Sequence, residues 1–470
     1  MASYSRIIPL VVASALFMEN MDSTIIATSM PAIAIDLHED PVILKLAFTT
    51  YLLSLMVFIP VSGWCADRFG GRNIFRVAIA TFVFGSVLCG FAHSLEGLIF
   101  ARAVQGLGGA MMVPVGRLII LRTVPKSELV SALALLTVPA LIGPLIGPLI
   151  GGFITTFFHW RWIFWINIPV GLVGLALATQ FMPDIREEPP GPLDFTGFFL
   201  SAAGLSMTVF GTTVLGRDVL PGLAAPAMIA AGVVFIGLYV RHARRVSNPI
   251  LDLKLLRLPT FRSAVSGGTV FRMGIGAIPF LMPLMLQLGF GLTPFQSGSL
   301  TFAAAAGAMT MKLTARRILM WFGFRNVLIF NALVSAVFLA AQGLFTAETS
   351  HLVILVVLLI GGFFRSLQFT SLNAIAYSNI EKRDLGRATS FYSVAQQLSL
   401  AAGVACAAFA LEGSQYFRGA TALAPADFSV AFFVVAAVSA LSVFSYLRLS
   451  PDAGAEVSGR SVVVTEGEKA

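Results

Sequence analysis

The sequence predicts an all-α integral membrane protein with fourteen transmembrane helices. Hydrophobic residues make up 57% of the 470-residue chain and charged residues only 11%, and the mean hydropathy is +0.87. Apolar runs of about 20 residues, the length of an α-helix that crosses a bilayer, recur along the whole chain. A water-soluble domain carries about twice this charged fraction, so the composition excludes a soluble globular enzyme.

Each predicted span is an apolar run bounded by polar or charged residues. The first begins after a single basic residue, Arg6, and no small-residue cleavage site closes it, so we expect a retained span rather than a signal peptide. The ranges are 7–29, 46–66, 77–95, 98–121, 129–156, 162–182, 196–215, 221–241, 264–286, 297–318, 326–345, 352–374, 388–410 and 428–447.

The 31 Lys and Arg residues predict the topology, because most of them fall in loops on the side of the N-terminus. By the positive-inside rule both termini are cytoplasmic, which requires an even number of spans; twelve would also satisfy it. The expected location is the cytoplasmic, or inner, membrane. The exceptions are four residues on the opposite side, Lys45, Arg161, Arg217 and Arg418, and three inside spans, Arg102, Arg272 and Arg365.

A weak internal repeat predicts the domain organisation. FGGRN at 69–73 recurs as FGFRN at 322–326, KSEL at 126–129 has a looser echo in KRDL at 382–385, and RAVQ at 102–105 resembles RSLQ at 365–368. Parallel repeats of six spans, with a substrate site between them, build one large class of secondary transporters. We expect a six-helix half at 1–192, two inserted transmembrane helices at 193–245, a six-helix half at 246–450 and a disordered cytoplasmic tail at 451–470.

Two acids and one cation stand out inside the N-terminal spans. Glu19 and Asp22 are the only acids well inside a predicted span, so they are the available proton carriers. Arg102 needs a partner, because an Arg at the centre of a span costs about 2.5–3.5 kcal/mol. At about 1.5 Å per residue, Asp22 and Arg102 both reach the outer half of the bilayer, which predicts a direct or water-mediated bridge. The alternatives are that Arg102 extends to the outer headgroups and that Glu19 recognises cationic compounds.

The loop GWCADRFGGRNIFR at 63–76 combines turn-forming glycines with an acid and several cations. Asp67 is expected to pair with Arg68, Arg72 or Arg76 in one conformation and to release them in another. The loop resembles the signature loop of the major facilitator superfamily, and the matching residues are Gly63, Asp67, Arg68, Gly70 and Arg72. The resemblance implies a latch between transport states. The second copy has Met320 in place of the acid, which implies an asymmetric latch.

The fifth predicted span contains VPALIGPLIGPLIGG at 138–152, with a glycine at every fourth position and two prolines that bend the helix. It resembles the antiporter motif of exporters in that superfamily. The stretches MDSTIIATSMP and WRWIFWINIPVG extend the resemblance, to the 14-helix drug:proton antiporters of the EmrB/QacA type, over nearly the whole chain, although Ala27 replaces a usual Asn. Arg102, Gln105 and Gly106 match a family motif in which the Arg assists proton transfer. The antiporter-motif residues are Gly143, Pro144, Gly147, Pro148, Gly151 and Gly152.

The expected function is therefore proton-coupled export of small amphipathic or drug-like molecules. A dedicated exporter of one metabolite, lipid or siderophore and a non-transporting sensor are the alternatives. The expected partners are a small-molecule substrate, protons and membrane lipids; the need for an adaptor or outer-membrane partner is open. Besides Gln105, the candidate cavity residues, suited to an anionic or polar substrate, are Arg272, Arg365, Gln368, Asn373, Gln396 and Gln397.

Several other classes of function are not expected. The chain has no Gly-x-x-x-x-Gly-Lys-Ser/Thr loop, which argues against an intrinsic ATPase as the energy source. Its three Cys and five His lack metal-ligand spacing, so we expect no metal and no cofactor. The basic residues lie between the apolar runs and do not form one basic face, which argues against nucleic acid as a partner.

Overall fold

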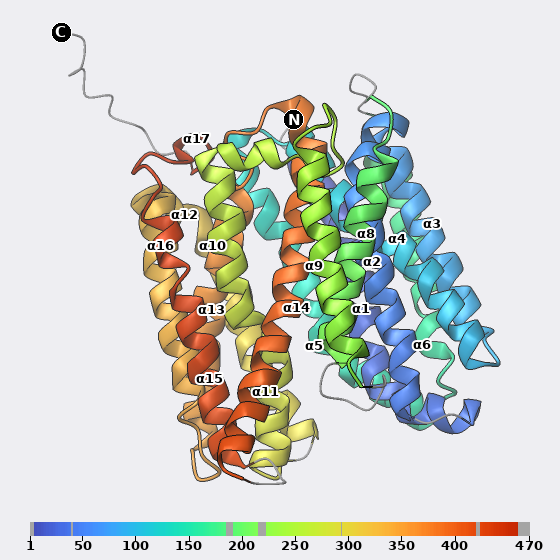
Figure 1. Cartoon of the computed structure of the whole chain (residues 1–470), viewed down its shortest axis with the longest axis vertical. Coiled ribbons are helices and arrows are strands. Elements are labelled where there is room, and N and C mark those ends of the chain that lie inside the picture. Colours follow the sequence, from blue (N-terminus) through green and yellow to red (C-terminus); the bar gives the residue numbers. More distant parts are fainter. Residues whose placement is uncertain are drawn as a thin grey trace. The chain divides into compact units, whose positions relative to one another are not determined.

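The structure, a computed structural model, describes residues 4–38, 41–184, 191–214, 222–292, 294–419 and 424–458, and all regular structure in these ranges is helical (Figure 1). Four short turns of 3-10 or π-helix are η1 (Lys126–Glu128), η2 (Leu253–Arg257), η3 (Met285–Gly289) and η4 (Lys382–Asp384). The α-helices are α1 (Tyr4–Leu37), α2 (Pro41–Phe69), α3 (Gly71–Gly90), α4 (Leu95–Thr123), α5 (Leu129–Phe157), α6 (Trp162–Trp165), α7 (Asn167–Phe181), α8 (Phe195–Val214), α9 (Ala224–Ala243), α10 (Pro259–Gly276), α11 (Ile278–Leu284), α12 (Pro294–Gln342), α13 (His351–Ile375), α14 (Leu385–Phe417), α15 (Pro425–Ala440), α16 (Val443–Tyr446) and α17 (Ala455–Ser458).

Within the described ranges, eleven helical segments are long and apolar enough to cross a membrane. One of them lies in α12, whose 49 residues run as two helices because Gly323 interrupts the helical backbone with φ 73°. The all-α membrane fold is thus confirmed, whereas the count of fourteen crossings stays a prediction. The sidedness of the termini also stays a prediction; Arg217 and the side chain of Lys45 lie outside what the structure describes.

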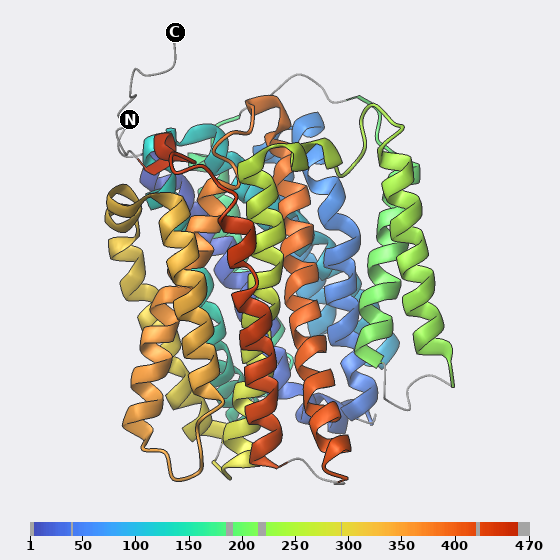
Figure 2. The same cartoon turned by 60° about the vertical axis from the view of Figure 1, so that its left-hand side comes forward.

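The chain divides into two compact units. The first comprises 1–123, 135–255 and 381–405, and the second comprises 124–134, 256–380 and 406–470. The first unit includes α8 and α9, which run side by side (Figures 1 and 2) and pack closely where Gly232 meets Thr208. In the second unit α12 packs along α13. The domain boundaries expected from the sequence remain predictions.

The repeated sequence motifs adopt the same local structures. Gly70 and Gly323, the first glycines of FGGRN and FGFRN, both have positive φ, 88° and 73°. Each therefore breaks the helix at the same motif position, in a conformation that L side chains rarely adopt. KSEL and KRDL both form a short 3-10 turn, η1 or η4, that leads directly into a long helix, α5 or α14.

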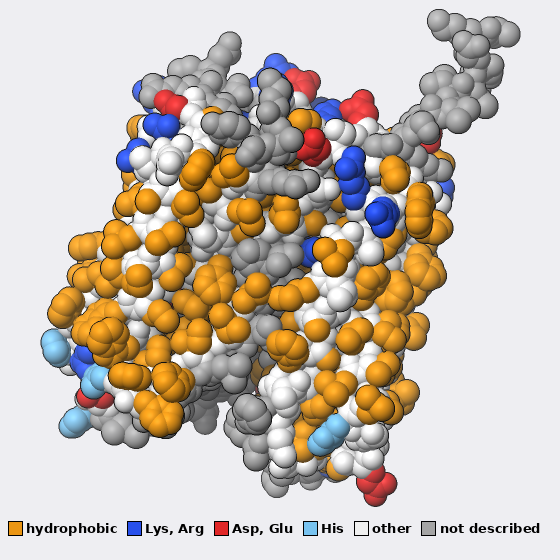
Figure 3. Space-filling view, turned by 180° about the vertical axis from the view of Figure 1, so that it is seen from behind, with side chains coloured by type: hydrophobic (Ala, Val, Ile, Leu, Met, Phe, Trp, Pro, Cys, Tyr) orange, Lys and Arg blue, Asp and Glu red, His pale blue; other side chains and the backbone are white. Residues whose placement is uncertain are grey.

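The outward surfaces of the helices suit a lipid environment. Many large apolar side chains are exposed, among them Phe100, Phe199 and Leu313. On the face drawn in Figure 3, hydrophobic side chains cover the middle of the helices and charged side chains gather toward the helix ends. Since lipid tails replace water around a transmembrane segment, such exposure carries no penalty there.

The segment after Pro451 is partly ordered. Residues 455–458 form α17, in which Val457 is 1% exposed, and the Glu456 carboxylate lies 2.8 Å from the Lys126 ammonium in the turn η1. The prediction of a disordered tail from residue 451 is therefore wrong for 451–458. The polar composition suggests disorder, but Ala455, Val457 and Ser458 are buried, and Glu456 pairs with Lys126 at the surface. Residues 459–470 lie outside the described ranges.

Candidate functional site

Asp22 and Arg102 form a buried ion pair in the first unit. Nη1 of Arg102, in α4, donates to Oδ2 of Asp22, in α1, across 2.6 Å. Asp22 is 2% exposed and Arg102 is fully buried. The structure therefore joins the two residues as the sequence suggested, and Arg102 does not extend toward the membrane surface.

Two neutral side chains, Gln105 and Asn167, also donate to the Asp22 carboxylate, and Ser86 bonds to Gln105. Nε2 of Gln105 donates to Oδ1 of Asp22 across 2.9 Å, and Nδ2 of Asn167 donates to the same atom across 2.7 Å. Gln105 also accepts from Nη1 of Arg102 at 2.5 Å and donates to Ser86 at 2.7 Å. One carboxylate thus accepts from three donors on α4 and α7, so each oxygen of this buried group has a hydrogen-bond partner.

Close helix packing makes this arrangement possible. A Cβ added to Gly85 in α3 would come within 2.6 Å of the Gln105 Cα, so α3 and α4 touch through their backbones at the site. The ring centroid of Tyr51, from α2, lies 4.4 Å from the Arg102 guanidinium carbon. An aromatic face attracts a cation and excludes water from it.

Sequence reasoning missed Ser86, Asn167 and Tyr51 as members of this site. All three are buried, and their side chains are uncharged. A single uncharged polar residue in an apolar run is common in packed membrane helices, so it gives no clear signal. For Asn167 the one available signal is its place in WRWIFWINIPVG, a stretch that carries the family resemblance.

Glu19 lies one turn before Asp22 on α1 but outside the hydrogen-bonded group. It is 8% exposed, and among the described residues its Oε2 atom has no hydrogen-bond partner. Its Oε1 atom and the Tyr51 hydroxyl lie 3.7 and 3.0 Å from the point where a Cβ of Gly109 would stand. The structure therefore separates the two acids: Asp22 is fully engaged, whereas Glu19 faces a small-residue position of α4.

The glycines of the antiporter-like motif pack against the segment of α1 that carries both acids. A Cβ on Gly143 would lie 2.9 Å from the Met21 nitrogen and 3.0 Å from the Phe17 carbonyl oxygen, and one on Gly147 would clash with Thr24. Gly151 is buried as well. Pro144, Pro148 and Gly152 belong to α5, but their side-chain environments lie outside what the structure describes.

The latch-like loop forms an ion pair that the sequence did not predict. Oδ1 of Asp67 lies 2.7 Å from Nη2 of Arg122, at the end of α4, and the two side chains are 11% and 4% exposed. The sequence predicts partners within the loop, namely Arg68, Arg72 or Arg76. In the structure Arg68 is exposed, and Arg72 donates to the Met182 carbonyl across 3.4 Å. The end of α4 thus supplies a partner for Asp67 from outside the loop, and pairing within the loop stays a prediction.

Gly63 and Asp67 both lie against the start of α14. The Gly63 nitrogen donates to the Ser390 hydroxyl across 2.9 Å, and a Cβ on Gly63 would overlap the Gly386 carbonyl. A Cβ on Gly386 would lie 2.6 Å from Oδ2 of Asp67. The carboxylate therefore stands at the amino-terminal end of a helix, where the helix dipole favours negative charge.

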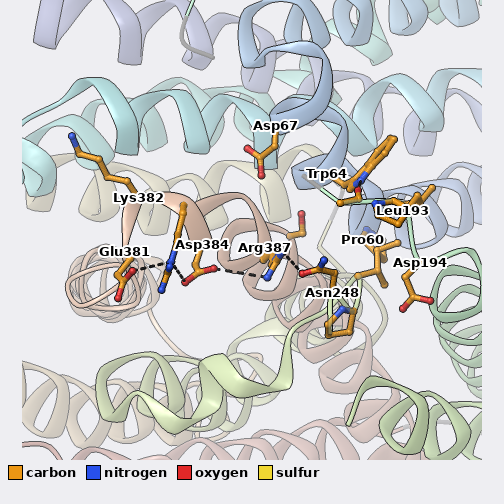
Figure 4. Close-up of a pocket in the computed structure, with 16 residues that line it drawn as sticks. Pro60, Trp64, Asp67, Leu193, Asp194, Asn248, Glu381, Lys382, Asp384 and Arg387 are labelled. Carbon is orange, nitrogen blue, oxygen red and sulfur yellow. Dashed lines mark hydrogen bonds and ion pairs between the residues drawn. The ribbon is translucent and has the colours of Figure 1, made fainter. Parts of the chain in front are cut away.

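A cavity of about 820 Å³ opens beside this loop within the first unit (Figure 4). Trp64, Asp67 and Asp194 line one part of it. Arg387, which donates to Oδ1 of Asn248 across 3.0 Å, lines another. The loop, the segment before α8, the segment after α9 and the start of α14 thus meet at one cavity.

A second polar cluster lies at the carboxyl-terminal end of α1. Asp36 accepts from the Trp160 indole across 3.0 Å and from the Arg161 guanidinium across 2.7 Å. These bonds, led by that from Trp160, hold the pKa of Asp36 below its ordinary value. His159 lies 3.6 Å from the same carboxylate. Among the described residues, no three His, Cys, Asp or Glu side chains are arranged to hold a metal ion.

The remaining candidate cavity residues divide between the units. In the first unit Gln396 accepts from Arg117 across 3.0 Å, and Gln397 is partly exposed on the same helix, α14. Arg117 lies inside a predicted span and is 6% exposed. It is therefore a buried cation, although the topology prediction counts it among the loop residues. Helix α4 thus contacts the polar face of α14 through the hydrogen bond from Arg117 to Gln396.

In the second unit the candidates lie on α10 and α13. Gln368 is fully buried and donates to the Leu328 carbonyl across 3.1 Å, so it contacts backbone in α12. Asn373 is 6% exposed. Arg272 is fully buried, whereas Arg365 is partly exposed. Lys312, in α12, is a further cation within a predicted span.

Comparison with known proteins places these observations in context. Residues 12–250 and 264–465 match the family model described as Major Facilitator Superfamily. The chain is 35% identical to "Probable transport protein HsrA" of Haemophilus influenzae over 93% of its length and 95% of the relative. It is 34% identical to "Putative multidrug resistance protein MdtD" of Escherichia coli, over 94% of each chain.

Two solved structures share the fold at low sequence identity. The human organic anion transporter MFSD10 (TETRAN) aligns with a TM-score of 0.69 at 14% identity and covers 94% of this chain and 99% of its own. The proton:xylose symporter XylE aligns with a TM-score of 0.68, also at 14% identity, over 97% of this chain and 99% of its own. At this identity the likeness establishes the fold alone.

Proposed function

Since the chain belongs to the major facilitator superfamily, and is therefore a membrane transporter rather than an enzyme, we propose that it is a proton-coupled exporter of small molecules. The observation that carries the proposal is the buried carboxylate of Asp22, which bonds to Arg102, Gln105 and Asn167 in one hydrogen-bonded group. A carboxylate held inside the membrane in this way can take up or release a proton when its surroundings rearrange.

Coupling follows from competition for the Asp22 carboxylate. When Asp22 is ionised, Arg102 and the two amides satisfy it; when it is protonated, Arg102 loses its counter-ion and its surroundings must rearrange. One proton that moves down 100 mV releases about 2.3 kcal/mol, enough to hold a substrate gradient of about fiftyfold. Protonation and deprotonation from opposite sides of the membrane would then drive alternation between two states.

Export rather than import is supported by the helix that packs on the acids. Gly143 and Gly147 seat α5 directly on the α1 segment that carries Glu19 and Asp22. A shift of Asp22 on protonation would therefore move the part of α1 against which α5 packs. The E. coli relative named as a multidrug resistance protein supports the same direction and suggests drug-like substrates.

The cytoplasmic location of both termini belongs to the same proposal. It places the loop with Asp67 on the cytoplasmic side, where the Asp67–Arg122 pair and the Gly63–Gly386 contact act as a latch for one transport state. Breaking these contacts would release the start of α14. The proposal includes an inner-membrane location.

The test is transport of rhodamine 123, a cationic dye, in proteoliposomes with an imposed pH gradient. Wild-type protein should accumulate the dye against its gradient, and Asp22→Asn should abolish accumulation while the protein remains folded and inserted. Glu19→Gln is the matched variant: it removes the other buried acid and should leave proton-driven transport of neutral compounds intact. Undiminished pH-driven accumulation in Asp22→Asn would refute the coupling assignment.

A further inference from the structure

The chain that follows α16 folds back onto the second unit. We call residues 451–458, which end in the short helix α17, the C-terminal strap (Figure 1). The strap packs on α12 and on the turn η1. Val457 is 1% exposed, and the Glu456 carboxylate lies 2.8 Å from the Lys126 ammonium. One short segment therefore joins two parts of the second unit that are far apart in the sequence.

The strap covers the break in α12. A Cβ on Gly454 would lie 2.7 Å from Cδ2 of Phe324, so the backbone of the strap lies directly on this ring. Phe324 is fully buried and follows Gly323, where the helical backbone of α12 is interrupted. The packing of the strap therefore contributes to the burial of an aromatic ring beside that break.

The two copies of the repeated loop bind the end of a helix in the same way. Arg72 of FGGRN donates to the carbonyl of Met182, the residue that follows α7, across 3.4 Å. Arg325 of FGFRN donates to the carbonyl of Leu447, the residue that follows α16, across 3.3 Å. Because the two copies share this contact, they can be compared at the positions where they differ.

The copies differ in the source of their carboxylate. The first loop carries Asp67, which lies against Gly386 at the start of α14. The second loop has Met320 at the corresponding place, which carries no charge. Glu456 of the strap instead brings a carboxylate to Lys126, in the turn η1 that leads into α5. Since η1 and η4 hold matching places in the repeat, the strap supplies beside α5 the charge that the loop supplies beside α14.

We propose that the C-terminal strap is a second latch of the transport cycle. It holds the turn η1, and with it the start of α5, on the break in α12 in one transport state and releases both in the other. Residues 129–134 of α5 belong to the second unit, and the rest of the helix belongs to the first. The same helix packs through Gly143 on the segment of α1 that carries Asp22. The inference rests on alternation between two transport states, as the proposed function does, but not on proton coupling or on the direction of transport.

The contacts of the strap suit a latch that must open. The side chains of Lys126 and Glu456 are 58% and 76% exposed. An ion pair between exposed side chains contributes little to stability, because water screens both charges. The burial of Val457 and the packing of Gly454 on Phe324 therefore provide most of the attachment. The ion pair determines where the strap binds rather than how tightly.

The test joins the strap to η1 covalently. In a chain without its three native cysteines, Lys126→Cys and Glu456→Cys are cross-linked with a short bismaleimide, and peptide mass spectrometry confirms the link. The link should slow downhill exchange of rhodamine 123 in proteoliposomes at least tenfold, because the cycle needs the latch to open. N-ethylmaleimide, which blocks both thiols without joining them, should leave the rate unchanged. Asp452→Cys with Glu456→Cys links the strap only to itself and is the matched control.

Hydrogen exchange of the full-length protein in nanodiscs gives a readout that needs no transported dye. Val457→Asp should speed exchange of the backbone amides at 124–130 and 322–328 at least tenfold, because the strap no longer protects them. The cross-link should slow exchange in the same stretches. Glu412→Gln, which removes an exposed acid elsewhere in the second unit, should leave exchange in both stretches as it is. If Val457→Asp fails to insert, Glu456→Lys takes its place, and Lys126→Glu should reverse its effect.

Three results would overturn the proposal. The first is a cross-linked protein that exchanges dye at the wild-type rate. The second is hydrogen exchange at 124–130 and 322–328 that neither Val457→Asp nor the link changes, and the third is failure of the link to form. A wild-type protein that carries no rhodamine 123 but shows both hydrogen-exchange effects would count against the proposed function and would support the strap as a latch.

Discussion

Gly143 of α5 lies directly against Met21 of α1, so that a Cβ at this glycine would come within 2.9 Å of the Met21 backbone nitrogen. Met21 immediately precedes Asp22, the acid that pairs with Arg102. The contact ties a helix whose sequence is typical of antiporters to the backbone of the proposed proton site. A substitution that displaces α5 at Gly143 should therefore also change proton-driven transport.

Gly143→Ala should impair proton-driven transport. The added methyl group requires a backbone shift in α1, and overpacking of this kind costs about 1–3 kcal/mol. The initial rate of rhodamine 123 accumulation in proteoliposomes measures the effect. Gly237→Ala is the control, because no atom lies within 4 Å of its added Cβ; an equal loss in both variants would contradict the packing argument.

Asn167→Ala should reduce transport at least tenfold without preventing membrane insertion. The substitution removes the 2.7 Å hydrogen bond to Asp22 and leaves the carboxylate with one donor fewer in a dry site. Rate measurements under an imposed pH gradient, together with thermal unfolding of the purified protein, separate this effect from misfolding. Asn379→Ala, at an exposed position, serves as the control, and a wild-type rate in Asn167→Ala would remove Asn167 from the site.

The Asp67–Arg122 pair should give a measurable coupling energy. A double-mutant cycle with Asp67→Asn and Arg122→Gln should yield about 1–3 kcal/mol in the free energy of unfolding, because both side chains are largely buried. Arg68→Gln replaces an exposed cation in the same loop and should show no coupling with Asp67→Asn. Coupling to Arg68 instead of Arg122 would restore the pairing that the sequence suggested.

The sequence carried the main features of the fold because membrane helices leave a strong signal. Long apolar runs mark spans, and charge inside a run marks a site, which is how Asp22 and Arg102 could be brought together from depth alone. The repeated motifs FGGRN and FGFRN both keep a glycine, Gly70 or Gly323, at the position where the structure has a positive φ.

The parts that sequence reasoning missed depend on contacts between distant segments. Arg122 pairs with Asp67 because the end of α4 returns to the loop, a tertiary contact with no local pattern. Asn167 is one polar residue in an apolar run. Lys312 lies near the end of a predicted span, and its contact with Thr370 on α13 has no local pattern either.

Acid should weaken the fold through Asp36, which lies beyond the first predicted span. Bonds from Trp160 and Arg161 lower the pKa of this carboxyl, so its contribution to stability is present above its unfolded pKa of about 4 and is lost as pH falls through the lower folded value. Thermal unfolding at pH 5 and pH 3 should show a smaller drop in midpoint for Asp36→Asn than for wild type. Glu348→Gln, at an exposed position, should behave as wild type; the same drop in Asp36→Asn would contradict the assignment.

The most direct measurement records proton movement itself. Proteoliposomes with an interior pH-sensitive dye and no imposed pH gradient receive a rhodamine 123 gradient, and both fluxes are followed together. Wild-type protein should move protons opposite to the dye, whereas Asp22→Asn should exchange dye across the membrane without moving protons. Proton movement that persists in Asp22→Asn, at the wild-type ratio to dye, would contradict the assignment of Asp22 as the proton carrier.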